Sequence, residues 1–328
     1  MKRAFAIRMT AGIAAALSFG TSSFTAVAQT YPSKPVRILS AFGPGNPADT
    51  ALRLVTQKMG ESMGQPILVE PQTVASGVGA AQIVMRAPAD GHTLLYVLPS
   101  MLMIPPYLIK NKPFDPMKDF TPVTSVVDGP IAISVHPSYP GKSVKEMIDL
   151  AKASPGKYTY GTNGIGGTYH LEMELFKQQF GVNLVQVPYK TSIEAINALV
   201  GGEIPLVYAP VGAVMPLVRA GKMRLLVVLD YKRYPDLPNV PAMGEEISGY
   251  QRIPTGLNFY GPAGLPPAIS RRIHSEVVKA LQAPDVASKL KEFTFFGIGS
   301  SPEALAEQQV KDYAVIAKAV KAAGIEAQ

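Results

Sequence analysis

Residues 36–54 read VRILSAFGPGNPADTALRL, and this stretch indicates the fold class. A β-branched, apolar run leads into a turn rich in Gly and Pro, and an amphipathic helical pattern follows directly. Gly43 and Gly45 permit the backbone conformations that such a turn needs, and Asp49 suits the first helical turn. Unpaired N–H groups at a helix start favour a carboxylate or phosphate. The stretch therefore predicts an anion-binding strand-to-helix loop.

A second segment of the same kind lies more than a hundred residues further along the chain. Residues 157–180 read KYTYGTNGIGGTYHLEMELFKQQF, again a strand, a Gly-rich turn and a helical pattern. Two such loops predict a clamp that holds one ligand from both sides.

Strands alternate with helices along the whole chain, which favours layers of parallel α/β structure. We expect strands at 36–41, 67–70, 93–97, 123–127, 131–135, 158–161, 184–188, 206–209 and 224–229, and helices at 49–63, 80–86, 144–153, 168–180, 192–200, 212–220, 268–282, 286–293 and 302–323. A first crossing between two lobes is expected around residues 128–135, and a return crossing around 250–260. Lobe 1 then comprises residues 29–128 and 251–328, and lobe 2 comprises residues 129–250.

The N-terminus has the pattern of a secretory signal peptide. Lys2, Arg3 and Arg8 precede an apolar stretch, and Ala26-Val27-Ala28 supplies a small-x-small cleavage site. The alternative, a membrane anchor, is disfavoured because polar and small residues interrupt the apolar stretch before it reaches the roughly 20 residues of a span. We expect residues 1–28 to be removed after Ala28 and the mature protein to be periplasmic.

Composition argues against several classes of function. The chain has no cysteine, so it carries neither disulfides nor thiol redox chemistry. The formal net charge of +7 falls to +4 without residues 1–28, too little for a nucleic-acid footprint. The four histidines lack metal-ligand spacing, and no nucleophile elbow, P-loop or dinucleotide fingerprint occurs. We therefore expect no catalytic residues, metal or cofactor, and a monomer.

The order of several segments resembles one receptor family over essentially the whole mature chain. These segments are YPSKPVRILSAFGPGNPAD, MGQPILVEPQ, RAPADGHTLLYV, FDPMKDFTPV, VPYKTSIEAINALVGGEI, AGKMRLLVV, LPNVPAMGE and AVKAAGI. Together they are similar to the substrate-binding proteins of tripartite tricarboxylate transporters, also called Bug receptors. The resemblance implies a two-lobed periplasmic binding protein of the Venus-flytrap type with two crossings. Such a receptor closes over a small organic carboxylate and delivers it to one small and one large integral membrane subunit.

The resemblance also implies where the ligand carboxylate binds, held by backbone amides, small hydroxyl groups and water. The implied residues are Phe42, Gly43, Asn46, Ala48 and Asp49 in the first loop, Ser100 after the third strand, Thr162, Asn163, Gly164, Gly166, Gly167 and Thr168 in the second loop, Lys190, Thr191 and Ser192 after VPY, and Tyr208 and Ala209 in LVYAP. The alternative for the hydroxyl and amide residues of the second loop is ordinary turn and capping chemistry. Lys190 suits a solvated position equally well.

Two departures from the family pattern bear on the ligand. Where relatives that bind amino acids are expected to carry an acid, this chain has Ala209, so an ammonium group would lack a partner. Residues 98–103 (LPSMLM) are apolar, which suits an aromatic or bulky acid, although core packing explains them equally well. Two other functions remain open: a ligand-presenting sensor for a membrane kinase, and a periplasmic enzyme, which would need an acid/base pair that the sequence does not show.

Overall fold

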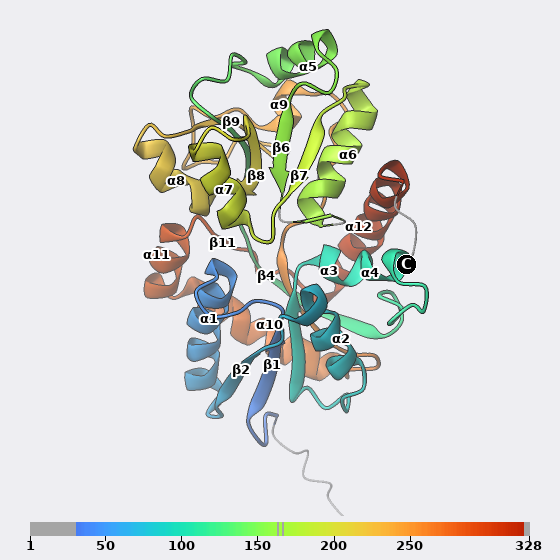
Figure 1. The fold of residues 1–328 in the computed structure, drawn as a ribbon. Helices are drawn as coiled ribbons and strands as arrows, with labels where there is room; N and C mark the ends of the chain where they lie inside the picture. Colours follow the sequence, from blue (N-terminus) through green and yellow to red (C-terminus); the bar gives the residue numbers. More distant parts are fainter. Residues whose placement is uncertain (1–30, 163, 166, 325–328) are drawn as a thin grey trace, which may run out of the picture. The chain divides into compact units, whose positions relative to one another are not determined.

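Two β-sheets organise the chain in this computed structural model, which describes residues 31–162, 164–165 and 167–324 (Figure 1). The predicted signal peptide, Asn163 and Gly166 lie outside the described residues. From Pro32 onward the chain forms one compact unit. Both sheets carry helices, so the predicted α/β fold with two sheet-plus-helix lobes is confirmed.

The first sheet has six strands in the order β11-β4-β10-β3-β1-β2. Their bounds are β1 Val36–Ser40, β2 Ile67–Pro71, β3 Thr93–Val97, β4 Phe120–Asp128, β10 Leu257–Pro262 and β11 Phe296–Gly297. β1 is parallel to β2 and β3, whereas β10 is antiparallel to β3 and β4. The parallel half therefore corresponds to the strand-helix alternation at the start of the chain.

The second sheet has five strands in the order β7-β6-β8-β5-β9. Their bounds are β5 Ile131–Val135, β6 Thr159–Thr162, β7 Val185–Pro188, β8 Leu206–Pro210 and β9 Arg224–Val228. β6 is parallel to β7 and β8, and β5 is antiparallel to β8 and β9. Both sheets are thus mixed rather than parallel, because strands next to the crossings run against their neighbours.

The chain changes sheets twice, between β4 and β5 and again between β9 and β10. The predicted return crossing at 250–260 is wrong at its end, because β10 begins at Leu257 and pairs with β3 and β4 inside the first sheet. The lobe boundaries at 128/129 and 250/251 stay a prediction.

Helices cover both sheets. Their bounds are α1 Pro47–Met63, α2 Val78–Met85, α3 Pro99–Met103, α4 Pro105–Leu108, α5 Val144–Ala153, α6 Thr168–Phe180, α7 Ser192–Val200, α8 Val211–Arg219, α9 Met243–Glu246, α10 Pro267–Gln282, α11 Pro284–Glu292 and α12 Pro302–Ala322, with a 3-10 turn at Val74–Gly77. Every predicted strand and helix is present, with ends shifted by a few residues. The short helices α3, α4 and α9 were not predicted from the sequence.

Three apolar clusters lie around the second sheet and α12. One packs α5 and α6 on the sheet, and another packs α7 and α8 on it. A third joins Met103 of α3, Leu171 of α6 and Ile316 of α12. Because α3 follows β3 and α6 follows β6, this cluster connects elements that belong to different sheets.

Candidate functional site

The loops predicted to bind the ligand follow the carboxyl ends of parallel strands in each sheet. Ser100, directly after β3, and Thr168, shortly after β6, lie in direct contact. Their hydroxyl oxygens, Ser100 Oγ and Thr168 Oγ1, are 2.7 Å apart, and both side chains are buried. The structure therefore brings two predicted site residues together from the two sheets.

The loop after β1 satisfies several of its own polar groups. Asn46 is the N-cap of α1, and its Oδ1 accepts a hydrogen bond from the Ala48 N–H at 2.8 Å. The Phe42 N–H donates to Ser40 Oγ at 3.1 Å, and Gly45 has a φ of 85°. Pro47 has no N–H, so the first turn of α1 offers two fewer donors to a ligand than an uncapped helix start.

Asp49 is buried in the first turn of α1, directly after this loop, and is held by Arg53. Arg53 Nε donates to Asp49 Oδ2 at 2.8 Å and Nη2 donates to Oδ1 at 3.2 Å. This two-point pairing compensates the carboxylate charge. Asp49 therefore does not repel a ligand carboxylate as an unpaired charge would, and it orders the loop rather than offering a free acceptor.

The second loop is held by Gln186 of β7, which the sequence interpretation missed. Gln186 Nε2 donates to Thr162 Oγ1 at 2.7 Å and to the Gly164 carbonyl oxygen at 3.1 Å. Thr162 is fully buried, and Gly164 has a φ of 122° that side-chain-bearing residues rarely adopt. The available signal was a glutamine inside the otherwise apolar strand sequence LVQVP.

Gly167 is the N-cap of α6, and Thr168 is the first helical residue. Gly167 has extended backbone angles, φ −71° and ψ 165°, and α6 has no side-chain hydrogen bond at its N-cap. Because Gly167 has no side chain, this N-cap supplies no acceptor of the kind that Asn46 gives to α1. An anion can fill that place.

Thr191 and Lys190 serve as capping groups for α7. Thr191 Oγ1 accepts from the Glu194 N–H at 3.2 Å, and the Lys190 N–H donates to Glu194 Oε2 at 3.1 Å. This arrangement is a variant of the capping box, because Glu194 accepts from the N–H of the residue before the N-cap rather than from that of Thr191. Lys190 and Thr191 are exposed and Ser192 is half-buried, so capping accounts for this turn without a ligand.

Tyr208 and Ala209 are core side chains on opposite faces of the second sheet. Tyr208 belongs to the cluster under α5 and α6, with its ring 6.4 Å from that of Tyr169. Ala209 belongs to the cluster under α7 and α8 and is fully buried. Contact between Ala209 and a ligand would therefore require that core to open.

Within residues 98–103, predicted as a loop, Pro99–Met103 form the helix α3, and Leu98 is its N-cap. Leu102 and Met103 are buried, and Met103 packs against Leu171 and Ile316, so core packing accounts for these two side chains. Met101 is half-buried. A helix begins here because Pro99 suits the first helical position, a use of proline that the interpretation as a loop overlooked.

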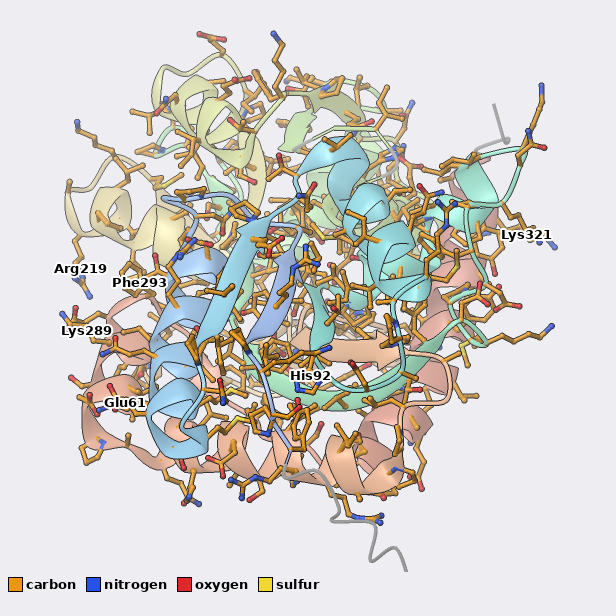
Figure 2. All side chains as sticks on the ribbon, turned by 90° about the horizontal axis from the view of Figure 1, so that it is seen from below. Glu61, His92, Arg219, Lys289, Phe293 and Lys321 are labelled. Atoms are coloured by element: carbon orange, nitrogen blue, oxygen red, sulfur yellow. The ribbon has the colours of Figure 1, made fainter. Side chains whose placement is uncertain are left out.

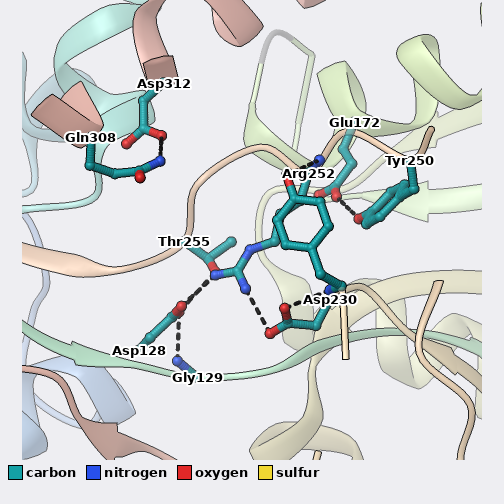
Figure 3. Close-up of polar contacts among 10 residues, drawn as sticks. Asp128, Gly129, Glu172, Asp230, Tyr250, Arg252, Thr255, Gln308 and Asp312 are labelled. Carbon is teal, nitrogen blue, oxygen red and sulfur yellow. Dashed lines mark hydrogen bonds and ion pairs between the residues drawn. The ribbon is translucent and has the colours of Figure 1, made fainter. Parts of the chain in front are cut away.

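A polar cluster lies where the chain passes between the sheets (Figure 3). Arg252 pairs with Asp128 at the end of β4, and Arg252 Nη1 donates to Asp230 Oδ2, just after β9, at 2.7 Å. Arg252 Nη2 also donates to Thr255 Oγ1 at 2.6 Å, and Thr255 Oγ1 donates to Asp128 Oδ1 at 2.9 Å. One guanidinium therefore connects both crossings.

Glu172, one turn after Thr168 on α6, lies beside this cluster (Figure 3). It is 2% exposed, and Tyr250 Oη donates to its Oε1 at 2.6 Å. Burial raises the pKa of Glu172 to about 7, although the Tyr250 hydrogen bond and the charge of Arg252 act in the opposite direction. Its carboxyl group is therefore partly protonated at neutral pH.

This pKa predicts that the protein loses stability as the pH rises. Because the folded-state pKa of about 7 exceeds the ordinary value of 4.5, the folded state holds more protons between these values. The free energy of unfolding should fall on the order of 3 kcal/mol between pH 4.5 and pH 8 from this group alone. Urea titrations of the protein and of Glu172→Gln measure the difference.

Asp312 changes the expected size of that effect but not its sign. Burial raises its pKa to about 6, so it destabilises the protein over an overlapping pH range. Glu172→Gln should therefore reduce the pH dependence without abolishing it. If the free energy of unfolding fell equally steeply with pH in both proteins, the assignment of this pH dependence to Glu172 would be wrong.

The described parts of the chain contain no group of three or more His, Cys, Asp or Glu side chains that could hold a metal ion. In the same residues, no helix is long and apolar enough to cross a membrane. His92 lies at the amino end of β3, opposite the loop edge, and its Nε2 accepts from the Ser33 N–H at 3.2 Å (Figure 2). This histidine therefore supports the fold rather than the loops.

Comparisons with known proteins agree with this geometry. The profile described as "Tripartite tricarboxylate transporter family receptor" matches residues 51–322. A protein of R. palustris solved with adipate is 31% identical, with a TM-score of 0.78 over 91% of this chain and 100% of that one.

Two further solved proteins are similar along nearly their whole length. The periplasmic binding protein BugD is 27% identical, with a TM-score of 0.75 over 91% of this chain and 100% of BugD. MatC from Rhodopseudomonas palustris with bound malate is 26% identical, with a TM-score of 0.75 over 88% of this chain and 100% of MatC. Since the family profile covers most of the sequence, the chain belongs to the receptor family of the tripartite tricarboxylate transporters.

Proposed function

We propose that this chain is a periplasmic receptor that captures a small organic carboxylate between the loops after β1 and β6. It then delivers the ligand to the small and large membrane subunits of a tripartite transporter. The observation that carries the proposal is the buried contact of Ser100 with Thr168, because it places the loop edges of both sheets against each other. A ligand held there touches both halves of the clamp.

The start of α6 is the stronger half of the proposed carboxylate site. Its N-cap is Gly167, which has no side chain to accept a hydrogen bond, whereas the start of α1 is capped by the Asn46 side chain. Neutral amide donors bind a carboxylate without the cost of burying a second charge. We therefore assign the ligand carboxylate to α6, with the loop after β1 closing over it.

Dicarboxylates are the ligand class that we propose, with aromatic ones among them. Two relatives were solved with adipate and with malate, both dicarboxylates. Next to the first loop, the ring of Phe42 packs edge-on against Tyr96, with centroids 6.0 Å apart, and Met101 is half-buried on α3. Phe42 and Tyr96 are themselves buried, so the half-buried Met101 is the side chain of the three that offers apolar surface to a ring or a methylene chain.

Amino acids should bind at least tenfold more weakly than adipate or phthalate, a difference of about 1.4 kcal/mol. The reason is that Asp49, the acid nearest the first loop, is already paired with Arg53. An ammonium group placed between the loops would lose its hydration without gaining a partner. Isothermal titration calorimetry with adipate, phthalate, malate, aspartate and glutamate measures the ranking.

The outcomes separate the parts of the proposal. Tighter binding of aspartate or glutamate would contradict the argument from the pairing of Asp49 with Arg53. Preference for malate over phthalate would contradict only the claim that aromatic dicarboxylates are among the ligands. Uptake of the best ligand by cells with and without this gene, each carrying the two membrane subunits, tests the delivery step.

A further inference from the structure

A cavity beside α6 shares no residue with the loops after β1 and β6. Its volume is about 440 Å³, within the range of roughly 300–1,000 Å³ typical of small-molecule pockets. The walls include Phe176 of α6, Tyr208 of β8, Tyr250 and Gln251 of the return crossing, and Lys318 of α12. Glu172 also lines it, so the buried carboxyl group described above faces this cavity.

Two polar atoms at the cavity have no hydrogen-bond partner of normal geometry among the described residues. They are Glu172 Oε2 and Tyr208 Oη, and their residues are 2% and 1% exposed. Tyr250 Oη donates to the other carboxylate oxygen, Oε1, and the Ile253 amide also acts on this carboxyl group. Buried polar atoms nearly always have a partner, so this pair indicates a missing donor in the cavity.

The charges around the cavity point to a cation. Arg252 is the guanidinium beside Glu172, and it is already bonded to Asp128 and Asp230 (Figure 3). The single positive charge of Arg252 therefore lies among three carboxyl groups, those of Asp128, Asp230 and Glu172. At the rim, Lys318 Nζ donates to Gln251 Oε1 at 3.0 Å. The ionised form of Glu172 thus lacks a cation bonded to it, and burying such a charge without a partner is costly.

We propose that this cavity binds the ammonium group of a small organic amine, which donates hydrogen bonds to Glu172 and Tyr208. An ammonium group has three N–H donors, enough for both unpartnered atoms. The aromatic side chains of Phe176, Tyr208 and Tyr250 suit an organic cation, whose charge is attracted to ring faces. A metal ion fits less well, because the described residues contain no cluster of three ligating side chains.

Benzylamine is the probe, and benzyl alcohol, which has the same ring without the charge, is its control. Calorimetry at pH 8 should show benzylamine binding with at least tenfold higher affinity than benzyl alcohol. Glu172→Gln should weaken benzylamine binding at least tenfold. The matched control is Glu174→Gln, because Glu174 lies two residues away on α6 and bonds to Tyr160 and Lys177 instead.

Because Glu172 can be protonated, the pH dependence of benzylamine affinity is a second test. The groups that act on this carboxyl are Tyr250, Arg252, Asp230, Tyr169, Tyr208 and the Ile253 amide, and their net effect with burial is a pKa of about 7. Affinity for benzylamine should therefore fall about tenfold between pH 8 and pH 6. Tyr208→Phe, which removes one acceptor without changing charge, should weaken binding severalfold and serves if Glu172→Gln fails to fold.

Three results would overturn the proposal: no heat of binding at 50 mM benzylamine, equal affinity for benzyl alcohol, or unchanged affinity in both Glu172→Gln and Tyr208→Phe. Binding that appears only after Lys318→Met would overturn it as well, because it would mean that the Lys318 ammonium itself fills the cavity. None of these measurements involves a carboxylate ligand, so their outcome is independent of the receptor function.

Discussion

The Arg252→Met variant should lose about 3–5 kcal/mol of unfolding free energy, because removing one partner of a buried ion pair leaves the other uncompensated. The Arg252 side chain is 14% exposed, and its partners Asp128 and Asp230 are 13% and 29% exposed. Methionine keeps the apolar stem but supplies no donor, so two mostly buried carboxylates and the Thr255 hydroxyl lose a bond together. Urea unfolding followed by circular dichroism at pH 7 measures the loss.

Arg233→Met is the matched control from the same stretch of chain. Arg233 Nη2 lies 3.0 Å from Glu245 Oε2, but these side chains are 43% and 40% exposed. Exposed ion pairs contribute about 0–1 kcal/mol to stability, so the free energy of unfolding of this variant should be close to that of the parent protein. Similar losses in both variants would mean that the cluster around Arg252 is as weak as a surface pair.

The order of strands and helices could be predicted because local patterns in this chain agree with the fold. Prolines explain three of the five errors in where helices begin. The prediction begins three helices one or two residues late, whereas the structure begins them at Pro47, Pro267 and Pro284. Proline suits the first helical turn, where its missing N–H has no helical partner.

The candidate loops could be located from sequence, but the partners of their side chains could not. Asn46 and Thr191 looked like ligand donors, and the structure shows that both are used as helix caps. Sequence alone cannot separate these roles, since the same short polar side chains serve both. The contact of Ser100 with Thr168 depends on how two sheets meet, which no local pattern encodes.

Long-range polar contacts were the least predictable feature. Gln186 reaches back 24 positions to Thr162, and Arg252 reaches 124 positions to Asp128. A lone glutamine in an apolar strand or a lone arginine in a crossing carries no sign of its partner. Only the register of β6 with β7, and the point at which the chain changes sheets, bring these groups together.

The Gly167→Val variant should lose at least about 100-fold in affinity for adipate, or about 2.8 kcal/mol. Gly167 has a φ of −71° and a ψ of 165°, a conformation that valine also adopts, so the substitution adds no backbone strain. Its branched side chain stands beside the first amides of α6, where we place the ligand carboxylate. Calorimetric titration with adipate measures the affinity.

The effect on folding should be small by comparison. Replacing an N-cap glycine with valine costs about 1 kcal/mol of stability, because glycine is tolerated at that position and valine is disfavoured. Gly181→Ala at the other end of α6 is the matched control: its φ of 62° makes the substitution destabilising by about 1 kcal/mol, but it lies a whole helix away from the loop. If both variants bind adipate equally well, the start of α6 does not hold the carboxylate. If Gly167→Val alone loses binding while both unfold at similar urea concentrations, the loss reflects the occupied anion site rather than a weakened helix.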